Sequence, residues 1–444
     1  MIKFIKNNYH YFILFIFIFL TYSIFIFPNN YGDPMNNYGF SMAITKGLLP
    51  YLDFNTISTP LYSFVMSIGL FIWNNYSMFL LEQSLLVTIM FYILNKIYGK
   101  KSYIILLIIC LLGCFGINAT YNFFAFFMMI ILLFLEDKYP NKDYIIGVVI
   151  ALAILCKHTV GILLIMPSLI YYFKDKRKLL KRFIGLLIPS IIFVIYLLIT
   201  NSYKEFIDLC FLGLFDFSKN NTNIYILWFY LSIALFIISL IITIKKKNIK
   251  NIYLLCGVSF VIPLFDLCHF SIYALCIAIQ FLPFIKKHEN YIGFLSFILS
   301  ILIVIISYLS LTNLYHPVLN KKLKHFEYVN NGKHNYEETI KFFKIYDEYP
   351  NALILSYSKM EYDITRDNNI DYFDVLLYGN FGYNGSKKMI NKIEKMKDIY
   401  IIVDERGYLN NNSDSQLDKS IIKYVMENYN KVDEKYDFLI YYKD

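Results

Sequence analysis

Apolar runs recur along the chain from its N-terminus to about residue 312, and many are long enough to cross a lipid bilayer. The hydrocarbon core of a bilayer is about 30 Å thick, so a spanning α-helix needs about 20 predominantly apolar residues. Hydrophobic residues make up 57% of the 444 positions and charged residues only 17%, whereas soluble domains carry about 25% charged residues. The sequence therefore predicts an α-helical polytopic membrane protein.

Basic residues indicate how the chain is oriented. The formal net charge is +9, and basic residues cluster in short loops at 174–182, 245–247 and 286–287. Such loops are typical of the cytoplasmic side under the positive-inside rule. A basic groove with interleaved aromatic residues is missing from the sequence, so we expect the lipid bilayer and not nucleic acid as the partner of these charges.

The start of the chain resembles a secretory signal. Lys3 and Lys6 precede the apolar run 11–27, but no small-x-small cleavage site follows. We therefore expect an uncleaved anchor, with a cytoplasmic N-terminus, in a multi-pass plasma-membrane protein of about 11 crossings. Residues 60–95 must cross an odd number of times in this scheme, and their number of crossings stays open.

Two polar elements interrupt the later apolar runs. Lys157 and His158 lie in the middle of the apolar stretch 144–173. One straight helix would leave a lysine near the bilayer centre, where charge is costly. Two short helices that meet at these residues on the outer face avoid that cost. Asp266 and His269 are expected in a second outer turn, between apolar runs 252–268 and 269–285.

The tail, residues 313–444, differs in composition from the rest. It is rich in Lys, Asp, Glu and Asn, and short apolar runs at 352–355, 400–403 and 438–442 alternate with amphipathic stretches such as 337–346 and 386–396. This alternation predicts an extracytoplasmic soluble α/β domain. The first domain, residues 1–312, would hold the membrane helices and a first outer loop at 28–59.

Cysteine spacing gives no sign of a metal or redox site. All seven cysteines lie in or beside apolar runs, and no pair has a zinc-binding or redox spacing. The sequence predicts no cofactor, and whether a divalent metal takes part stays open.

The first outer loop carries the side chains most typical of chemistry. Asp33 and Asp53 lie in it together with Tyr38 and Tyr51. A carboxylate at a bilayer boundary is costly unless it faces water, a partner or a substrate. A loop that only connects two helices would need neither aspartate.

Residues 1–312 resemble the GT-C glycosyltransferases, and in particular bacterial relatives of protein O-mannosyltransferases and of lipid A aminoarabinose transferases. The resemblance rests on three elements of the sequence: Asp33-x4-Tyr38-x4-Ala43-x3-Gly47-x2-Pro50-Tyr51-x-Asp53 followed by Thr59-Pro60-Leu61-Tyr62, then Lys157-His158-Thr159-x-Gly161, and Pro263-x2-Asp266-x2-His269-Phe270. It implies transfer of a sugar from a polyprenyl-phosphate donor to a glycan, lipid or protein acceptor at the outer membrane face. Many relatives have a second acidic residue beside the first, where this chain has Pro34.

The resemblance implies that Asp33 is the catalytic base. Asp33 would take the proton of an acceptor hydroxyl in one displacement that inverts the anomeric centre. Lys157, with His158 or His269, would receive the charge of the leaving phosphate. The other residues assigned to substrate binding are Asp53, Tyr38, Tyr51 and Asp266, and the two tyrosine rings would stack on the sugar.

Structural roles are the alternative for each of these residues. Asp33 can cap a helix, Asp53 can order the loop, and Lys157 can extend to the membrane interface. Asp266 and His269 can pair only with each other across a helix turn. Among other functions, a transporter or flippase of lipid-linked saccharides is the main rival, followed by a polysaccharide polymerase or ligase and a structural membrane anchor.

Overall fold

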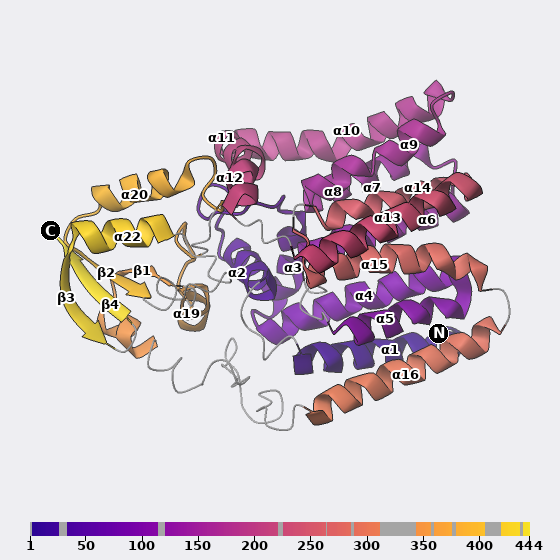
Figure 1. Cartoon of the computed structure of the whole chain (residues 1–444), viewed down its shortest axis with the longest axis horizontal. Coiled ribbons are helices and arrows are strands. Elements are labelled where there is room, and N and C mark those ends of the chain that lie inside the picture. The colour runs from indigo at the N-terminus through magenta and orange to yellow at the C-terminus, as the bar shows by residue number, and fades with distance from the viewer. Residues whose placement is uncertain are drawn as a thin grey trace. The chain divides into compact units, whose positions relative to one another are not determined.

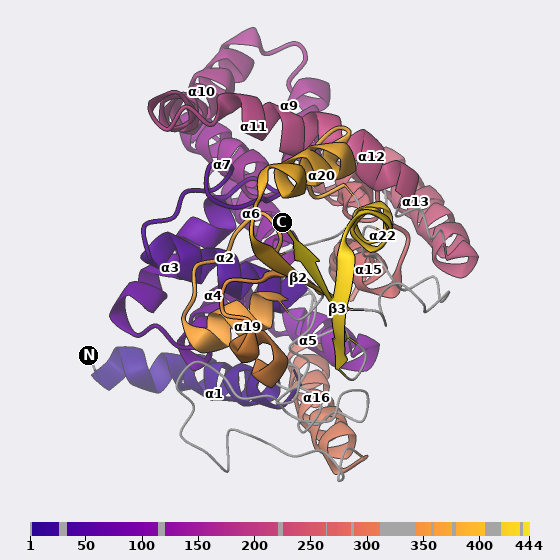
Figure 2. The same cartoon turned by 90° about the vertical axis from the view of Figure 1, so that its left-hand side faces the viewer.

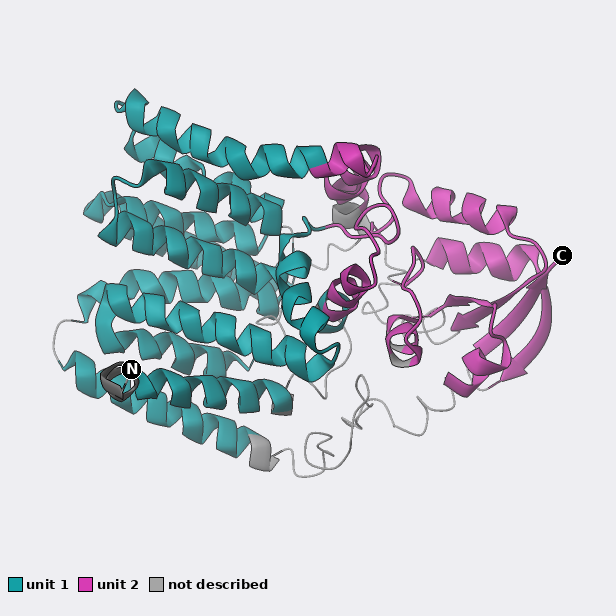
Figure 3. Ribbon diagram, turned by 180° about the vertical axis from the view of Figure 1, so that it is seen from behind, with its two compact units in different colours: residues 1–37, 58–195, 224–313 teal, residues 38–57, 196–223, 314–444 magenta. Residues whose placement is uncertain are grey.

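The chain is predominantly helical in the computed structural model (Figure 1). The structure describes residues 2–25, 33–113, 120–220, 225–262, 264–285, 288–310, 343–356, 359–374, 379–404, 419–435 and 438–444. These residues form two compact units (Figure 3). Unit 1 contains residues 1–37, 58–195 and 224–313, and unit 2 contains residues 38–57, 196–223 and 314–444.

Unit 1 is a bundle of apolar helices. Its helices are α1 (Ile2–Phe25), α3 (Leu61–Ile72), α4 (Tyr76–Tyr98), α5 (Tyr103–Leu112), α6 (Tyr121–Lys138), α7 (Asp143–Cys156), α8 (His158–Leu163), α9 (Met166–Tyr171), α10 (Lys176–Ile199), α13 (Ile226–Lys246), α14 (Ile249–Cys256), α15 (Leu267–Phe281) and α16 (Glu289–Ser310), with the helical turns η1 (Gly99–Ser102), η4 (Gly257–Phe260) and η5 (Leu282–Phe284). In the described part of the chain, five helical segments are long and apolar enough to cross a membrane. They are Tyr76–Leu112, Lys176–Ile199, Ile226–Lys246, Leu267–Phe284 and Glu289–Ser307.

Three of these segments expose most of their apolar side chains. Only 22% of the most apolar window of Lys176–Ile199, 17% of that of Ile226–Lys246 and 22% of that of Glu289–Ser307 is buried inside the protein. Apolar helix faces left unburied over such a length belong in lipid, because water would make them strongly unfavourable. These exposed faces support the membrane assignment made from the sequence.

The apolar stretch around Lys157 forms two helices that fold back on each other. Lys157 ends α7 with an extended backbone (φ −146°, ψ 99°), and α8 begins at the next residue. A Cβ on Gly161 would lie 2.2 Å from the backbone nitrogen of Ile154, so only glycine lets α8 pack this closely against α7. The structure thus has the hairpin expected from the sequence and not one straight helix.

The segment 60–95 is divided at Asn75. Helix α3 has 12 residues, whereas α4 has 23 and begins with Asn75, whose side chain accepts a hydrogen bond from the Ser77 N–H. At 1.5 Å per residue these helices are about 18 Å and about 35 Å long, so α4 alone reaches across a hydrocarbon core.

Arg182 is buried, although its position in the basic loop 174–182 suggests an exposed side chain. Its side chain is 3% exposed and pairs with Glu136 (Nη1 to Oε1, 2.6 Å) and Asp143 (Nε to Oδ1, 3.0 Å). Nη1 also donates to Ser168 at 2.9 Å. A buried arginine between two carboxylates joins α6, α7, α9 and α10, so Arg182 is an internal connection and not an interfacial anchor.

Unit 2 combines two segments from the first 223 residues with the tail. Its elements are α2 (Asp33–Thr45), which begins in unit 1, α11 (Tyr203–Ile207), η3 (Asp208–Leu212), α12 (Gly213–Asn220), β1 (Leu353–Leu355), α19 (Lys359–Arg366), α20 (Gly385–Lys395), β2 (Ile399–Asp404), α22 (Lys419–Asn428), β3 (Asn430–Lys435) and β4 (Phe438–Lys443). Strands β1, β2 and β4 coincide with the apolar runs predicted as strands. Strand β3 is polar and exposed, which is why its composition did not reveal it.

The four strands, labelled in Figure 1, form one mixed sheet in the order β1-β2-β4-β3. Figure 2 shows β2 and β3 with helices α20 and α22 beside them. β1 pairs with β2 in parallel, and the two other pairings are antiparallel. Helices α20 and α22 pack on one face, where Ile393 and Ile422 meet Ile401 and Val403 in a buried apolar cluster. The outermost positions suit β1, which is short, and β3, whose Lys, Asp and Glu residues discourage pairing with another chain.

Candidate active site

Residues 33–45 of the expected first outer loop form helix α2, and a tight turn closed by Asp53 follows this helix. The Oδ2 of Asp53 accepts a hydrogen bond from the N–H of Leu49 at 2.7 Å, and the N–H of Asp53 donates to the carbonyl of Leu49 at 2.9 Å. Inside this turn Tyr51 has a positive φ of 71°, which is unusual for a residue with an aromatic side chain. Asp53 therefore orders the loop, and its side chain is only partly buried.

Tyr51 and Tyr38 are both fully buried. The Tyr51 ring packs edge-on against Phe206, with 5.3 Å between ring centroids, and its hydroxyl accepts from the Cys210 Sγ at 3.6 Å. Burial raises the pKa of Tyr51 well above its ordinary value. In this conformation neither tyrosine offers a ring face to a ligand, and both pack the interior of unit 2.

The tail holds the first loop through contacts that span more than 300 residues of sequence. The ammonium of Lys46 donates to the carbonyl oxygens of Asp367 and Asn368, both at 2.8 Å. The hydroxyl of Tyr372 donates to the carbonyl of Leu52, and the amide of Asn55 donates to the carbonyl of Tyr372 at 3.4 Å.

The segment 196–223 is bound to the tail in the same way. Asp208 pairs with Lys388, and its Oδ1 accepts from the N–H of Tyr383 at 3.2 Å. Asp216 accepts from the N–H of Asn384 at 2.7 Å. The first loop, this second loop and the tail are thus hydrogen-bonded into one unit.

Titratable side chains gather around Tyr372, and of these only Asp53 was singled out from the sequence. The Lys392 ammonium lies 3.3 Å from the centroid of the Tyr372 ring. Burial, followed by the negative charges of Glu205 and Asp53, raises the pKa of Tyr372. Three segments thus bring two carboxylates and a lysine to one phenol. No spacing in the sequence connects them, because they lie far apart along the chain.

Asp33 is the first residue of α2. Its side chain lies outside the part of the chain that the structure describes, so its role as the catalytic base stays a prediction. Pro34, the next residue, is buried in the first turn of the helix, where the missing N–H of proline costs no helical hydrogen bond.

Lys157 and His158 lie where α7 ends and α8 begins. The Lys157 ammonium donates to Oδ1 of Asn122 at 2.5 Å and lies 5.9 Å from the ring centroids of both Tyr121 and Phe260. His158 is buried. The Lys157 ammonium thus lies between an amide oxygen and two aromatic rings, contacts that are favourable for a positive charge.

Thr59, at the end of the first-loop motif, is attached to the same helix. Its hydroxyl donates to the carbonyl of Ile154 at 2.8 Å, less than one turn before Lys157. Two elements that are about 100 residues apart in the sequence, Thr59-Pro60 and Lys157-His158, therefore lie at one end of α7.

Asp266 and His269 form a pair at the start of α15. Asp266 caps the helix, since its Oδ1 accepts from the N–H of His269 at 2.8 Å, and its Oδ2 lies 2.8 Å from Nδ1 of the His269 ring. Burial alone would raise the pKa of Asp266, but the hydrogen bonds and charge of His269 lower it below its ordinary value. The i, i+3 pairing considered from the sequence is present.

The predicted site residues thus fall into separate groups. Tyr38, Tyr51 and Asp53 belong to unit 2, and Lys157, His158, Asp266 and His269 belong to unit 1. Among the described residues, no cluster of His, Cys, Asp and Glu side chains has the arrangement of a metal site.

A buried ionic cluster in unit 2 was also missed by sequence reasoning. The Lys359 ammonium lies 2.6 Å from Asp363, 2.9 Å from Asp374 and 3.3 Å from Asp371. Lys359, Asp363 and Asp374 are almost fully buried. The spacing of Lys359 and Asp363, four residues apart on α19, is the one signal that could have found part of it.

Comparisons of the chain with protein-family models, curated proteins and solved structures find no match.

Proposed function

We propose that this protein is a membrane glycosyltransferase that passes a sugar from a polyprenyl-phosphate donor to a cell-envelope glycan, lipid or protein acceptor. The observation that supports the proposal most is the hydrogen bond from Thr59 to Ile154. It joins the first-loop motif to the helix break that carries Lys157 and His158, and both elements belong to the GT-C resemblance.

The proposed chemistry is a single displacement that inverts the anomeric centre. Asp33 takes the proton of the acceptor hydroxyl as the oxygen attacks. The leaving group is a lipid phosphate, whose charge is received by Lys157 together with His158 or His269. Asp266 orients the ring of His269 through a hydrogen bond to its Nδ1, as carboxylates commonly do for histidines.

The first loop supplies the rest of the proposed site. Asp53, which is partly exposed at the turn, is the second carboxylate. Tyr38 and Tyr51 were expected to stack on the sugar, but their burial favours a role in packing the loop.

The finer topology is part of the same proposal. It has about 11 crossings, a cytoplasmic N-terminus, and unit 2 on the outer face of the plasma membrane. The hydrogen bonds that join the first loop, the segment 196–223 and the tail support it, because the crossing scheme places all three on one side.

A transfer assay in detergent tests the function. The purified protein is incubated with a radiolabelled polyprenyl-phosphate sugar and a candidate acceptor, and a second, separable labelled product is expected. Transfer needs no sealed compartment, whereas transport does. Absence of product with every lipid-linked sugar tested, together with movement of these lipids across liposomes, would replace the transferase by the rival flippase.

A further inference from the structure

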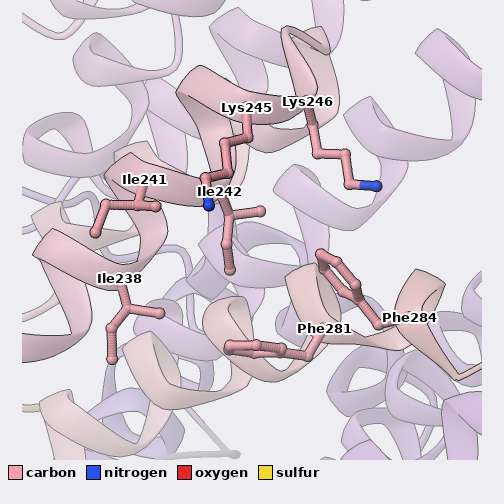
Figure 4. Close-up of a pocket in the computed structure, with 7 residues that line it drawn as sticks. All are labelled: Ile238, Ile241, Ile242, Lys245, Lys246, Phe281 and Phe284. Carbon is pink, nitrogen blue, oxygen red and sulfur yellow. The ribbon is translucent and has the colours of Figure 1, made fainter.

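One groove in unit 1 has no part in the proposed sugar transfer. It has a volume of about 610 Å³ and runs between the last turns of α13 and the end of α15 with η5 (Figure 4). This size is within the range of about 300–1,000 Å³ that is usual for small-molecule sites. The groove is therefore large enough to hold part of a lipid.

The walls of the groove are apolar and open to the surroundings. Ile238 and Ile241 of α13 are 40% and 47% exposed, and Phe281 and Phe284 on the facing wall are 44% and 49% exposed. All four belong to or adjoin segments long enough to cross a membrane. Acyl chains are the natural contact for such a surface.

Hydrogen bonds join the two helices that carry the groove. The side-chain N–H₂ of Gln280 donates to the Ser239 carbonyl at 3.3 Å and to the hydroxyl of Thr243 at 3.0 Å. These bonds hold α13 and α15 together next to the residues that line the groove.

Two lysines close one end of the groove. Lys245 and Lys246 line it from the last turn of α13, and the Lys246 ammonium lies 4.8 Å from the centroid of the Phe284 ring. Within the described part of the chain neither lysine forms an ion pair. The C-terminus of a helix carries partial negative charge, so these two side chains and not the backbone would attract an anion.

We propose that this groove binds one anionic phospholipid from the surrounding bilayer. An acyl chain lies against Ile238, Ile241 and Phe281, and the phosphate of the headgroup lies between Lys245 and Lys246. An apolar trough that ends in unpaired positive charge at a membrane boundary complements such a lipid at both ends. A zwitterionic lipid fits the trough equally well but gains much less from the lysines.

The test is native mass spectrometry of the full chain titrated with phosphatidylglycerol or phosphatidylcholine in detergent. The wild type is expected to bind one phosphatidylglycerol in preference to phosphatidylcholine. Lys245→Gln with Lys246→Gln should weaken phosphatidylglycerol binding about 25-fold, at about fivefold per lysine. Lys245→Arg with Lys246→Arg keeps the charge and should retain most of the binding.

Two further variants locate the site. Lys174→Gln with Lys176→Gln removes the same charge from another basic loop, where both side chains are exposed, and should leave binding unchanged. Ile238→Trp keeps both lysines but fills the trough, and should weaken binding of both lipids. Equal affinity for the two lipids, or wild-type binding by the double glutamine variant, would overturn the proposal. A dimer that Ile238→Trp dissociates would also overturn it, by assigning the groove to a second copy of the chain.

Discussion

The hydroxyl of Thr59 lies 2.8 Å from the carbonyl oxygen of Ile154. This contact joins Thr59, a residue of the first-loop motif, to the last turn of α7, whose C-terminal residue precedes Lys157. A threonine that satisfies a carbonyl at a helix end also fixes the start of α3, which begins two residues later at Leu61. The start of α3 is thereby held against the end of α7 that precedes Lys157.

Lys157 is expected to act on the lipid-phosphate donor. Lys157→Met should raise the KM for the lipid-linked sugar and leave the KM for the acceptor nearly unchanged, because only the donor brings a phosphate. Lys157→Arg should restore part of the activity, since it keeps the charge but changes the geometry of donation. Steady-state kinetics with each substrate varied in turn measures both effects. An equal rise in both KM values would point to a general loss of packing.

The side of the membrane on which unit 2 lies can be measured by labelling. Single cysteines at Leu52, Tyr203 and Val432, all exposed, should react with a membrane-impermeant reagent in intact cells. A cysteine at Lys247 should react only after the cells are opened. The background carries Cys268→Ser, because Cys268 is an exposed native cysteine. Labelling of Lys247→Cys with protection of Leu52→Cys would instead place unit 2 on the cytoplasmic side.

The pairing of Asp266 with His269 should make stability depend on pH. The pKa of Asp266 is lowered in the folded protein, so its ionised form stabilises the fold above the ordinary carboxyl pKa of about 3.9. That contribution is lost as the pH falls through the lowered folded value. Asp266→Asn retains an N-cap acceptor without the charge. The difference in Tm between wild type and this variant should be constant near neutral pH and vanish in acid; a difference that persists unchanged in acid would contradict the assignment.

Lys359 should be essential for the stability of unit 2. Lys359→Met leaves buried carboxylates without their counter-charge, which costs about 3–5 kcal/mol when a buried pair is broken from one side. Hydrogen exchange of the amides in β2 should speed up accordingly. Lys423→Met is the matched control, because Lys423 on α22 is 60% exposed and its loss should change stability by less than about 0.5 kcal/mol. Equal protection of the β2 amides from hydrogen exchange in both variants would contradict a stabilising role of the Lys359 cluster.

The sequence predicted local structure where a polar residue stood within an apolar run. Lys157 could not stay in the middle of an apolar helix, and the structure reverses the chain there. Asp266 and His269 were recognisable because their spacing brings them together within a single turn. In each case a local pattern carried the whole signal.

Contacts between distant segments could not be predicted in this way. No pattern in the sequence around Lys46 predicts that its ammonium binds the carbonyl oxygens of Asp367 and Asn368, more than 300 residues later. Arg182 stands among surface lysines in the sequence, and only the packing of α6 and α7 against α10 shows that it is buried. Burial and tertiary pairing of this kind depend on the fold as a whole.

The most direct test of the proposed transferase is the turnover of its carboxylate variants. Asp33→Asn keeps the size of the side chain but removes the proton acceptor, so the rate of sugar transfer from a polyprenyl-phosphate donor should fall by about 10² or more at unchanged expression. Asp398→Asn, at an exposed position with a positive φ of 50° that asparagine tolerates well, should behave as the wild type. Full activity of Asp33→Asn alone would move the base to Asp53 or Asp266. Full activity in Asp33→Asn, Asp53→Asn and Asp266→Asn alike would contradict the account.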